Sequence, residues 1–234
     1  GAAAILMSSS KADALGIAED KRVYIHGAGE AADDLISLRP HLDGSWAMKT
    51  AIARALDQAG KSSADLQHFD LYSCFPCAVF SSTAELGIDW KTDPRPLTLT
   101  GGLPFFGGPG NNYSLHGIAE MVSKLRANPA DFGLVLANGG WMTKEAVGVY
   151  SAQKPAAFVP AESYATPTEQ VTLCKEDCDG TLETFTVTHG KAGPEKGIAF
   201  VRLADGRRAL AVASPEALAV LREDASPVGR KVSV

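Results

Sequence analysis

The stretch GGLPFFGGPGNNYSLHG, from Gly101 to Gly117, guides the interpretation of the whole sequence. Six of its seventeen residues are glycine, two are proline, and the helical pattern IAEMVSKLR follows at once. Glycines let a backbone approach a ligand or another loop closely. The helix that follows offers free N–H groups and a positive dipole end. The stretch therefore predicts a functional loop at the start of a helix.

Two polar side chains at the start of this helix are candidates for that function. Asn112 and His116 are four residues apart, and so they share one face of the first turns. The helix dipole opposes extra positive charge on His116, which favours the neutral imidazole that a general base needs. The alternative is a histidine that only hydrogen-bonds between helix and loop, and the sequence leaves both open.

Strands and helices alternate along the first 151 residues, as is typical of an α/β layered domain. The clearest helix is Trp46–Ala59, which has an apolar face, a Ser45 cap and a terminating Gly60. We expect strands at residues 2–7, 22–26, 69–72, 97–100, 132–136 and 147–151, and further helices at 11–15, 78–86 and 112–127. Ligands usually bind at strand ends in such layers. The segment DLYSCFPC, residues 70–77, lies at such an end.

The pattern changes after Ser151. Three prolines mark a linker, and short β-rich runs follow at residues 181–188, 197–203, 208–213 and 231–234. We therefore expect two domains. Residues 1–155 form the α/β domain, and residues 160–234 form a small all-β module resembling an OB-type barrel.

Composition excludes several classes of protein. The chain has 234 residues, is 45% hydrophobic and 21% charged, and carries a net charge of −5 without a basic cluster, so nucleic acid is not an expected partner. No apolar run reaches the roughly 18 residues needed to cross a membrane. The start, GAAAILM, reads as an apolar strand entered halfway, and so we expect a piece of a larger protein.

The cysteines form two pairs, Cys74 with Cys77 and Cys174 with Cys178. The pairs lie about a hundred residues apart, much farther than in a zinc ribbon, which makes reduced thiols a better interpretation than a shared zinc site. We expect no bound metal. Gly27, Gly29 and Ala32 match the dinucleotide pattern G-x-G-x-x-A, but the sequence after them lacks the long helix and the acid-terminated strand that this fold requires.

Four stretches in this order resemble the C-terminal half of the thiolase superfamily, nearest its sterol-carrier-protein-linked branch. GAAAILM resembles the last strand of the N-terminal half, and YSCF at residues 72–75 resembles the His-Asp-Cys-Phe loop. GGLPFFGGPG resembles the Gly-His-Pro loop, and LANGGW at residues 136–141 resembles the closing Cys-x-Gly-Gly-Gly loop. The resemblance covers about residues 1–151 and implies a mixed five-stranded sheet with helices on both faces.

This sequence departs from the family at catalytic positions. Gly108 stands where the family has the histidine that activates its cysteine nucleophile, and Ala137 stands where it has its acid/base cysteine. Tyr72 takes the place of the histidine of the first oxyanion hole. The acylated cysteine of the family belongs to the N-terminal half, which these residues do not include.

The resemblance implies a thiolase-like acyltransferase of the acetyl-CoA acetyltransferase kind, acting in lipid metabolism on acyl-CoA, with CoA as co-substrate and no bound cofactor. The alternatives are a thiolase-fold retro-aldol lyase with Tyr72 as acid or base, and a non-catalytic acyl-CoA-binding scaffold. The expected catalytic residues are His116, Tyr72 and Asn138, and the expected CoA contacts are Gly107, Gly108, Asn112, Gly139 and Gly140. The implied partners are acyl-CoA and an N-terminal thiolase half, with a homodimer as a possible assembly and a cytoplasmic location.

Overall fold

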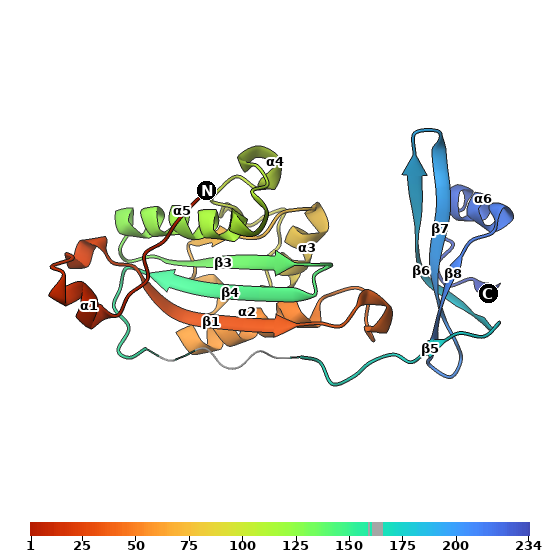
Figure 1. Ribbon diagram of the computed structural model, residues 1–234, viewed down its shortest axis with the longest axis horizontal. Coiled ribbons are helices and arrows are strands. Elements are labelled where there is room, and N and C mark those ends of the chain that lie inside the picture. Colours follow the sequence, from red (N-terminus) through yellow and green to blue (C-terminus); the bar gives the residue numbers. More distant parts are fainter. Residues whose placement is uncertain (159, 161–165) are drawn as a thin grey trace. The chain divides into compact units, whose positions relative to one another are not determined.

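The computed structural model describes residues 1–158, 160 and 166–234, and these form two compact units (Figure 1). The first unit contains Gly1–Asp33 and Asp43–Pro167. The second contains Asp34–Leu42 and Thr168–Val234. The short segment Asp34–Leu42, which the sequence analysis included in residues 1–155, thus belongs with the tail.

A mixed four-stranded sheet with the order β1-β4-β3-β2 forms the centre of the first unit. Its strands are β1 (Tyr24–Ala32), β2 (His68–Asp70), β3 (Phe132–Gly139) and β4 (Lys144–Ser151). β2 runs parallel to β3, whereas β4 runs antiparallel to both β1 and β3. The first five residues of β3 are all buried, as expected for a strand covered on both faces.

Helices cover both faces of this sheet (Figure 1). Leu134 and Leu136 of β3 pack with the α2 side of the core, whereas Val135 packs with Met121 and Leu125 of α5. The α-helices are α1 (Ser9–Ala14), α2 (Trp46–Ala59), α3 (Pro76–Glu85), α4 (Leu103–Phe106) and α5 (Tyr113–Ala127). Short 3₁₀ turns are η1 (Glu19–Lys21), η2 (Ile36–Leu38), η3 (Ser63–Asp65) and η4 (Gly110–Asn112). The α/β class inferred from the sequence is confirmed.

Two expected strands are wrong in detail. Residues 2–7 are extended but form no strand, and Ile5 and Leu6 are 87% and 82% exposed. Around residues 97–100 only a single antiparallel bridge forms, from Thr98 to Asp70, so the sheet of the described residues has four strands rather than five. A strand exists only where a neighbouring strand supplies hydrogen bonds along its length, and periodicity does not report that.

The second unit is built on a five-stranded sheet with the order β5-β8-β7-β6-β9. Its strands are β5 (Leu173–Cys174), β6 (Asp179–Gly190), β7 (Gly193–Arg202), β8 (Arg208–Val212) and β9 (Lys231–Ser233), and β6 and β7 form the long hairpin in Figure 1. A helix, α6 (Pro215–Glu223), follows β8. The unit is therefore not all-β, and its sheet order is open at β5 and β9, unlike a closed barrel.

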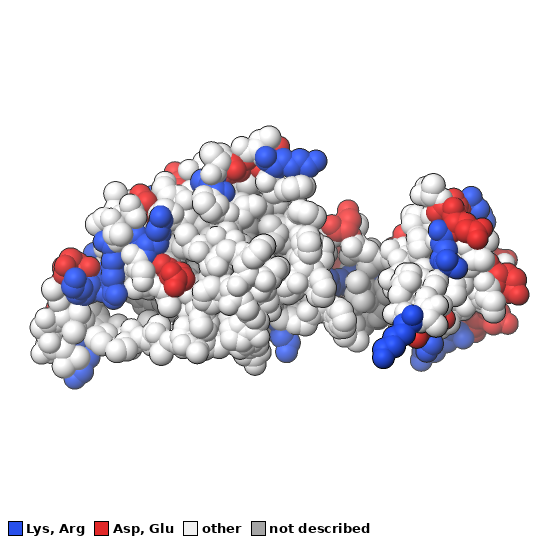
Figure 2. Space-filling model, turned by 90° about the horizontal axis from the view of Figure 1, so that it is seen from above, with Lys and Arg blue, Asp and Glu red and all other residues white. Residues whose placement is uncertain are grey.

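Charged side chains of both signs are interspersed on the face shown in Figure 2, and much of the first unit there is uncharged. This face carries no extended basic area of the kind that binds a nucleic-acid backbone. Within the described residues, no helix is long and apolar enough to cross a membrane.

The glycines of the dinucleotide-like pattern are packing positions inside β1. A Cβ on Gly27 would lie 2.0 Å from the carbonyl oxygen of Ala55, and one on Gly29 would lie 2.1 Å from that of Ala51. Both oxygens belong to the backbone of α2, which packs directly on the strand. These glycines therefore allow α2 to pack closely on β1. They lie inside a strand and do not form the phosphate-binding turn of a dinucleotide site.

We expect Gly29→Ala to lower the free energy of unfolding of the first unit by at least about 2 kcal/mol, because α2 must move away from the sheet. Gly108→Ala is the matched control, since an added Cβ there meets nothing within 4 Å, and it should stay within about 0.5 kcal/mol of the parent protein. Urea unfolding followed by circular dichroism measures both changes. Equal stability of the two variants would contradict the packing argument.

Candidate active site

Three loops of the first unit meet at one edge of the sheet. β2 and β3 are parallel, so their carboxyl ends point to the same edge, where α/β layers usually bind ligands. We define the loop cluster as the loop after β2 (residues 71–75), the glycine-rich loop (residues 97–108), and the end of β3 with the turn that follows it (residues 138–143).

A buried carboxylate ties the first two loops together. Asp70, the last residue of β2, is 1% exposed, and its Oδ1 accepts hydrogen bonds from the Thr100 N–H at 3.0 Å and the Thr100 hydroxyl at 2.9 Å. The Tyr113 hydroxyl lies 2.6 Å from Thr100 Oγ1. Because the Thr100 hydroxyl donates to Asp70, Tyr113 must donate to Thr100. The result is a hydrogen-bonded chain from the first residue of α5 to the end of β2.

The last glycine of the stretch from Gly101 to Gly117 makes room for this carboxylate. A Cβ on Gly117 would lie 2.3 Å from Asp70 Oδ2, so α5 approaches β2 closely only because residue 117 has no side chain. Burial raises the pKa of Asp70, and the hydrogen bonds from Thr100 oppose that rise.

A second set of contacts fixes the start of the glycine-rich loop. The Leu103 N–H donates to Ser73 Oγ at 3.1 Å, and Gly102 lies against the same side chain with φ at 88°. Gly107, which ends α4, has φ at 101°. Both values are in the region that favours glycine, so the loop needs these two glycines for its backbone path.

The expected catalytic residues fall into two neighbouring groups. Asn138 Nδ2 lies 3.8 Å from Cys74 Sγ, and Asn138 Oδ1 is buried without a hydrogen-bond partner in the described part of the chain. Tyr72 packs edge-on against Tyr113, with ring centroids 5.6 Å apart. Burial is the main cause that raises the pKa of Tyr72, so its hydroxyl stays protonated at neutral pH.

His116 belongs to the same row of rings. Its ring meets Phe106 edge-on at 5.1 Å, and Phe106 in turn lies 6.1 Å from Tyr113. His116 Nε2 is buried and makes no hydrogen bond within the described residues. The path from His116 to Tyr72 therefore runs through Phe106 and Tyr113. That His116 shares a pocket with Tyr72 and Asn138 stays a prediction.

The residues expected to contact CoA have local structural roles. The Asn112 side chain accepts from the Ala2 N–H at 2.7 Å and donates to the Ala2 carbonyl at 3.3 Å, and it does not cap α5. Gly139 ends β3, and Gly140 turns the chain with φ at 63°. The positions expected to contact CoA also include Gly107 and Gly108, which lie in an exposed part of the glycine-rich loop.

The turn after β3 contains a strained residue. Met142 has φ at 53°, in the left-handed region that non-glycine residues rarely adopt. Its carbonyl accepts a hydrogen bond from Ser45 Oγ at 2.9 Å. Backbone strain of this kind often accompanies functional sites. The sequence carried no signal for it, nor for the roles of Asp70, Thr100 and Tyr113.

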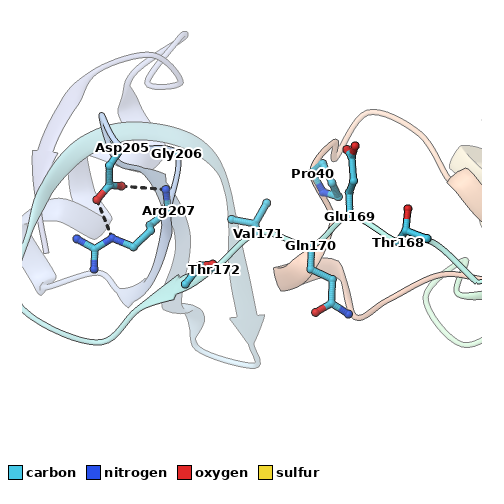
Figure 3. Close-up of a pocket in the computed structure, with 9 residues that line it drawn as sticks. All are labelled: Pro40, Thr168, Glu169, Gln170, Val171, Thr172, Asp205, Gly206 and Arg207. Carbon is cyan, nitrogen blue, oxygen red and sulfur yellow. Dashed lines mark hydrogen bonds and ion pairs between the residues drawn. The ribbon is translucent and has the colours of Figure 1, made fainter.

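Two of the hollows in the second unit are formed without any of the expected site residues. The first, of about 500 Å³, is lined by Pro40, residues 168–172 and residues 205–207, and there Asp205 binds Arg207 (Figure 3). The second, of about 740 Å³, lies next to α6 and has small apolar side chains from β7 and β8 in its lining. The described residues contain no group of three or more His, Cys, Asp and Glu side chains that could hold a metal ion.

A solved structure is similar to this chain over most of its length. A crystal structure of a monomeric SCP2-thiolase like protein type 1 from Mycobacterium smegmatis superposes with a TM-score of 0.86 and is 42% identical in sequence. The chain is SCP2-thiolase-like and belongs to the thiolase superfamily. The match covers 96% of this thiolase-like chain and 51% of the other, so the chain spans about half the length of that relative.

A family model supports the same assignment for the tail. The model for the thiolase-like protein type 1 additional C-terminal domain matches residues 159–234 of this SCP2-thiolase-like chain. No curated protein matches the chain. The resemblance found in the loops of the first unit is thereby confirmed at the level of family and fold.

The buried Asp70 predicts a pH dependence of stability. Its pKa is raised in the folded state, so the stability contributed by the protonated form is complete below the unfolded pKa near about 4 and is lost as pH rises through the folded value. Asp70→Asn avoids that loss. The free energy of unfolding of this variant, relative to the parent, should therefore rise as pH increases above about 4 until the folded pKa of Asp70 is passed.

Asp65→Asn is the matched control. Hydrogen bonds from Ser62 lower the pKa of Asp65, so the stability of this carboxylate is present above its unfolded pKa and is lost as pH falls. The relative stability of Asp65→Asn should therefore fall with rising pH, opposite to Asp70→Asn. Urea unfolding at a series of pH values measures both, and a flat profile for Asp70→Asn would contradict the assignment.

Proposed function

We propose that this chain forms the C-terminal half of a thiolase-like protein that acts on acyl-CoA, with the thioester group held at the loop cluster. The observation that supports this most directly is the position of Asn138, whose amide N–H contacts Cys74 Sγ at 3.8 Å. Sulfur is a weak acceptor, so a thioester oxygen would replace it favourably. Amide donors aimed at an oxygen that becomes negative are the usual components of an oxyanion hole.

Tyr72 supplies a second donor in this proposal. Its hydroxyl is neutral at pH 7, because burial raises its pKa. A neutral phenol can donate a hydrogen bond to the thioester oxygen, or give up and recover a proton during the reaction. Its ring is held by Tyr113, whose own hydroxyl is engaged with Thr100, which limits the positions that the Tyr72 hydroxyl can take.

The leading reaction is formation or cleavage of a carbon–carbon bond next to the thioester carbonyl, as in thiolase-like acyl transfer to or from CoA. A base removes a proton from the carbon next to the carbonyl, and Asn138 and Tyr72 stabilise the oxygen of the enolate that results. His116 is the proposed base. Its Nε2 has no hydrogen-bond partner in the described chain but is covered by Phe106, so this role requires α4 to move.

A retro-aldol lyase is the second candidate, and the absence of reactive side chains at Gly108 and Ala137 favours it. Neither can act as base or acid in place of the family's histidine and cysteine. Retro-aldol cleavage needs no covalent nucleophile. A base takes the proton of a β-hydroxyl group, the carbon–carbon bond breaks, and an aldehyde or ketone leaves. The neutral Tyr72 hydroxyl can then act as the acid that protonates the acyl-CoA enolate.

The remaining partners follow from the same proposal. We propose contacts with the CoA part of the substrate along Gly107 and Gly108 and at the Gly139–Gly140 turn, association with an N-terminal thiolase half, and a role in cytoplasmic lipid metabolism. The relative from Mycobacterium smegmatis is described as monomeric. A homodimer of the present chain is the less favoured assembly for that reason.

We expect the chain to bind acetoacetyl-CoA, and Asn138→Ala and Tyr72→Phe each to weaken binding by roughly 3- to 10-fold, the worth of one hydrogen bond. Isothermal titration calorimetry measures the dissociation constants. Asn128→Ala is the matched control, because its side chain only hydrogen-bonds to Lys124 at the end of α5. Binding that is equally tight in all three variants would show that the thioester is held elsewhere.

We expect the 234-residue chain alone to show no thiolysis of acetoacetyl-CoA by CoA. Covalent thiolase chemistry needs a thiolate activated by an adjacent base. The described partner of Cys74 is the amide of Asn138, which is no base, and Gly108 replaces the family's histidine. The measurement is the loss of acetoacetyl-CoA absorbance. Turnover above background that Cys74→Ala abolishes would identify Cys74 as a nucleophile and contradict this expectation.

A further inference from the structure

A buried ionic cluster lies at the base of the β6–β7 hairpin in the second unit. Arg208 is 0% exposed, and its guanidinium binds both oxygens of Glu183, with Nε–Oε2 at 2.7 Å and Nη2–Oε1 at 2.9 Å. Arg202 also binds Glu183. Burial opposes ionisation of Glu183, yet hydrogen bonds from Arg208 and Arg202 lower its pKa below the ordinary value. We call these three residues the arginine cluster.

The remaining donors of the arginine cluster bind the backbone of the segment Asp34–Leu42. Arg208 Nη1 donates to the carbonyls of Ser37 and Arg39, both at 2.8 Å, and Arg202 Nη2 donates to the carbonyl of Pro40 at 3.0 Å. A buried charge is tolerated only when its donors are satisfied. The cluster therefore fixes this segment, which we call the tether.

A backbone hydrogen bond also holds the tether to the C-terminal part of the chain. The Val171 N–H donates to the carbonyl of Leu38 at 2.8 Å. Four successive carbonyls of the tether, from residues 37 to 40, are thus bound by groups at least 130 positions further along the sequence. By itself this describes a segment captured by the C-terminal domain.

The residues on both sides of the tether bind the same turn of the first unit. On one side, the Asp33 N–H donates to the carbonyl of Thr143 at 2.7 Å. On the other, Ser45 Oγ donates to the carbonyl of Met142 at 2.9 Å. Both acceptors belong to the turn that follows Asn138 and contains the positive-φ residue Met142. Both flanks of the tether therefore hold the same strained turn.

We propose that Arg208 and Arg202 are positioning residues that set the conformation of the turn at residues 140–143, acting through the tether. The tether has nine residues, Asp33 directly precedes it, and two residues separate it from Ser45. A displacement of the tether backbone is therefore passed on to the residues that bind the turn. Only Gly139 lies between Asn138 and the turn, so in this proposal the C-terminal domain influences the direction of the proposed oxyanion donor. The importance for catalysis rests on the proposed function, but the coupling itself does not.

Fluorine NMR of the full chain labelled with 5-fluorotryptophan tests the coupling without any ligand. Trp141 lies in the turn, Trp46 is the first residue of α2, and Trp90 packs on Phe80 with ring centroids 4.6 Å apart. We expect Arg208→Met to move or split the Trp141 resonance by more than its linewidth and to leave the Trp90 resonance in place. Single Trp→Phe variants assign the three signals.

Arg207→Met is the matched control, since Arg207 precedes Arg208 but its side chain binds Asp205 and Glu176 and not the tether. It should leave the Trp141 signal unchanged. If Arg208→Met does not fold, the same spectrum of Arg202→Met tests the proposal. Arg202 is partly exposed and supplies only one of the bonds to the tether, so its replacement should disturb folding less. A Trp141 resonance unmoved in the folded variant, while hydrogen exchange shows residues 34–42 released, overturns the proposal.

A second experiment tests whether the tether itself transmits the effect of Arg208→Met to Trp141. Inserting Gly-Ser-Gly on each side of the tether, after Asp33 and after Leu42, leaves the arginine cluster with its bonds but slackens the connection to the turn. In this background, Arg208→Met should no longer move the Trp141 signal. A shift of the same size as without the insertions contradicts the proposed route. Failure of acyl-CoA to bind affects none of these readouts, so the proposed function and this inference fail separately.

Discussion

The hydrogen bonds between the Asp70 carboxylate and Thr100 are the interaction on which the loop cluster depends. They hold the glycine-rich loop to the end of β2, and they also orient the Tyr113 hydroxyl and so the ring on which Tyr72 packs. The carboxylate can be there only because Gly117 leaves α5 without a side chain at the point of contact. An ionisable group buried at this cost in stability is more typical of a functional site than of a simple connection between elements.

Features set by neighbouring residues could be predicted from the sequence. The helix Trp46–Ala59 has the expected bounds, because Ser45 accepts the Met48 N–H and Gly60 adopts the left-handed conformation. The helix α6 carried a comparable local signal, Ser214 followed by Pro215, which the β-rich interpretation of the tail overlooked. Residues 2–7 and 97–100 failed as strands because pairing partners, not periodicity, decide strand formation. The capture of the tether depends on contacts between residues about 170 positions apart, which no local pattern reports.

For the candidate site, sequence reasoning identified residue types better than their contacts. His116 and Asn138 each contain a buried polar atom that has no hydrogen-bond partner in the described chain, which sets them apart from side chains with a structural role. Asn112, by contrast, is occupied by the backbone of Ala2. Tyr72 could be proposed only from a family resemblance, because its ring contact joins the loop after β2 to α5, far along the sequence.

The loop cluster is thus held from two sides by different means. Asp70 fixes the glycine-rich loop, and the N–H of Asp33 and the hydroxyl of Ser45 bind the carbonyls of Thr143 and Met142 in the turn after β3. In the proposed coupling, the tether between these two residues transmits the effect of the arginine cluster to this turn. Asn138 is the next-to-last residue of β3, so only Gly139 separates it from that turn. Where the family has reactive side chains, Gly108 and Ala137 offer none, and yet the scaffold around them remains ordered by buried charges. Hydrogen-bond donors act through their position, so an ordered scaffold can orient a polar group even where residues 108 and 137 supply no reactive side chain.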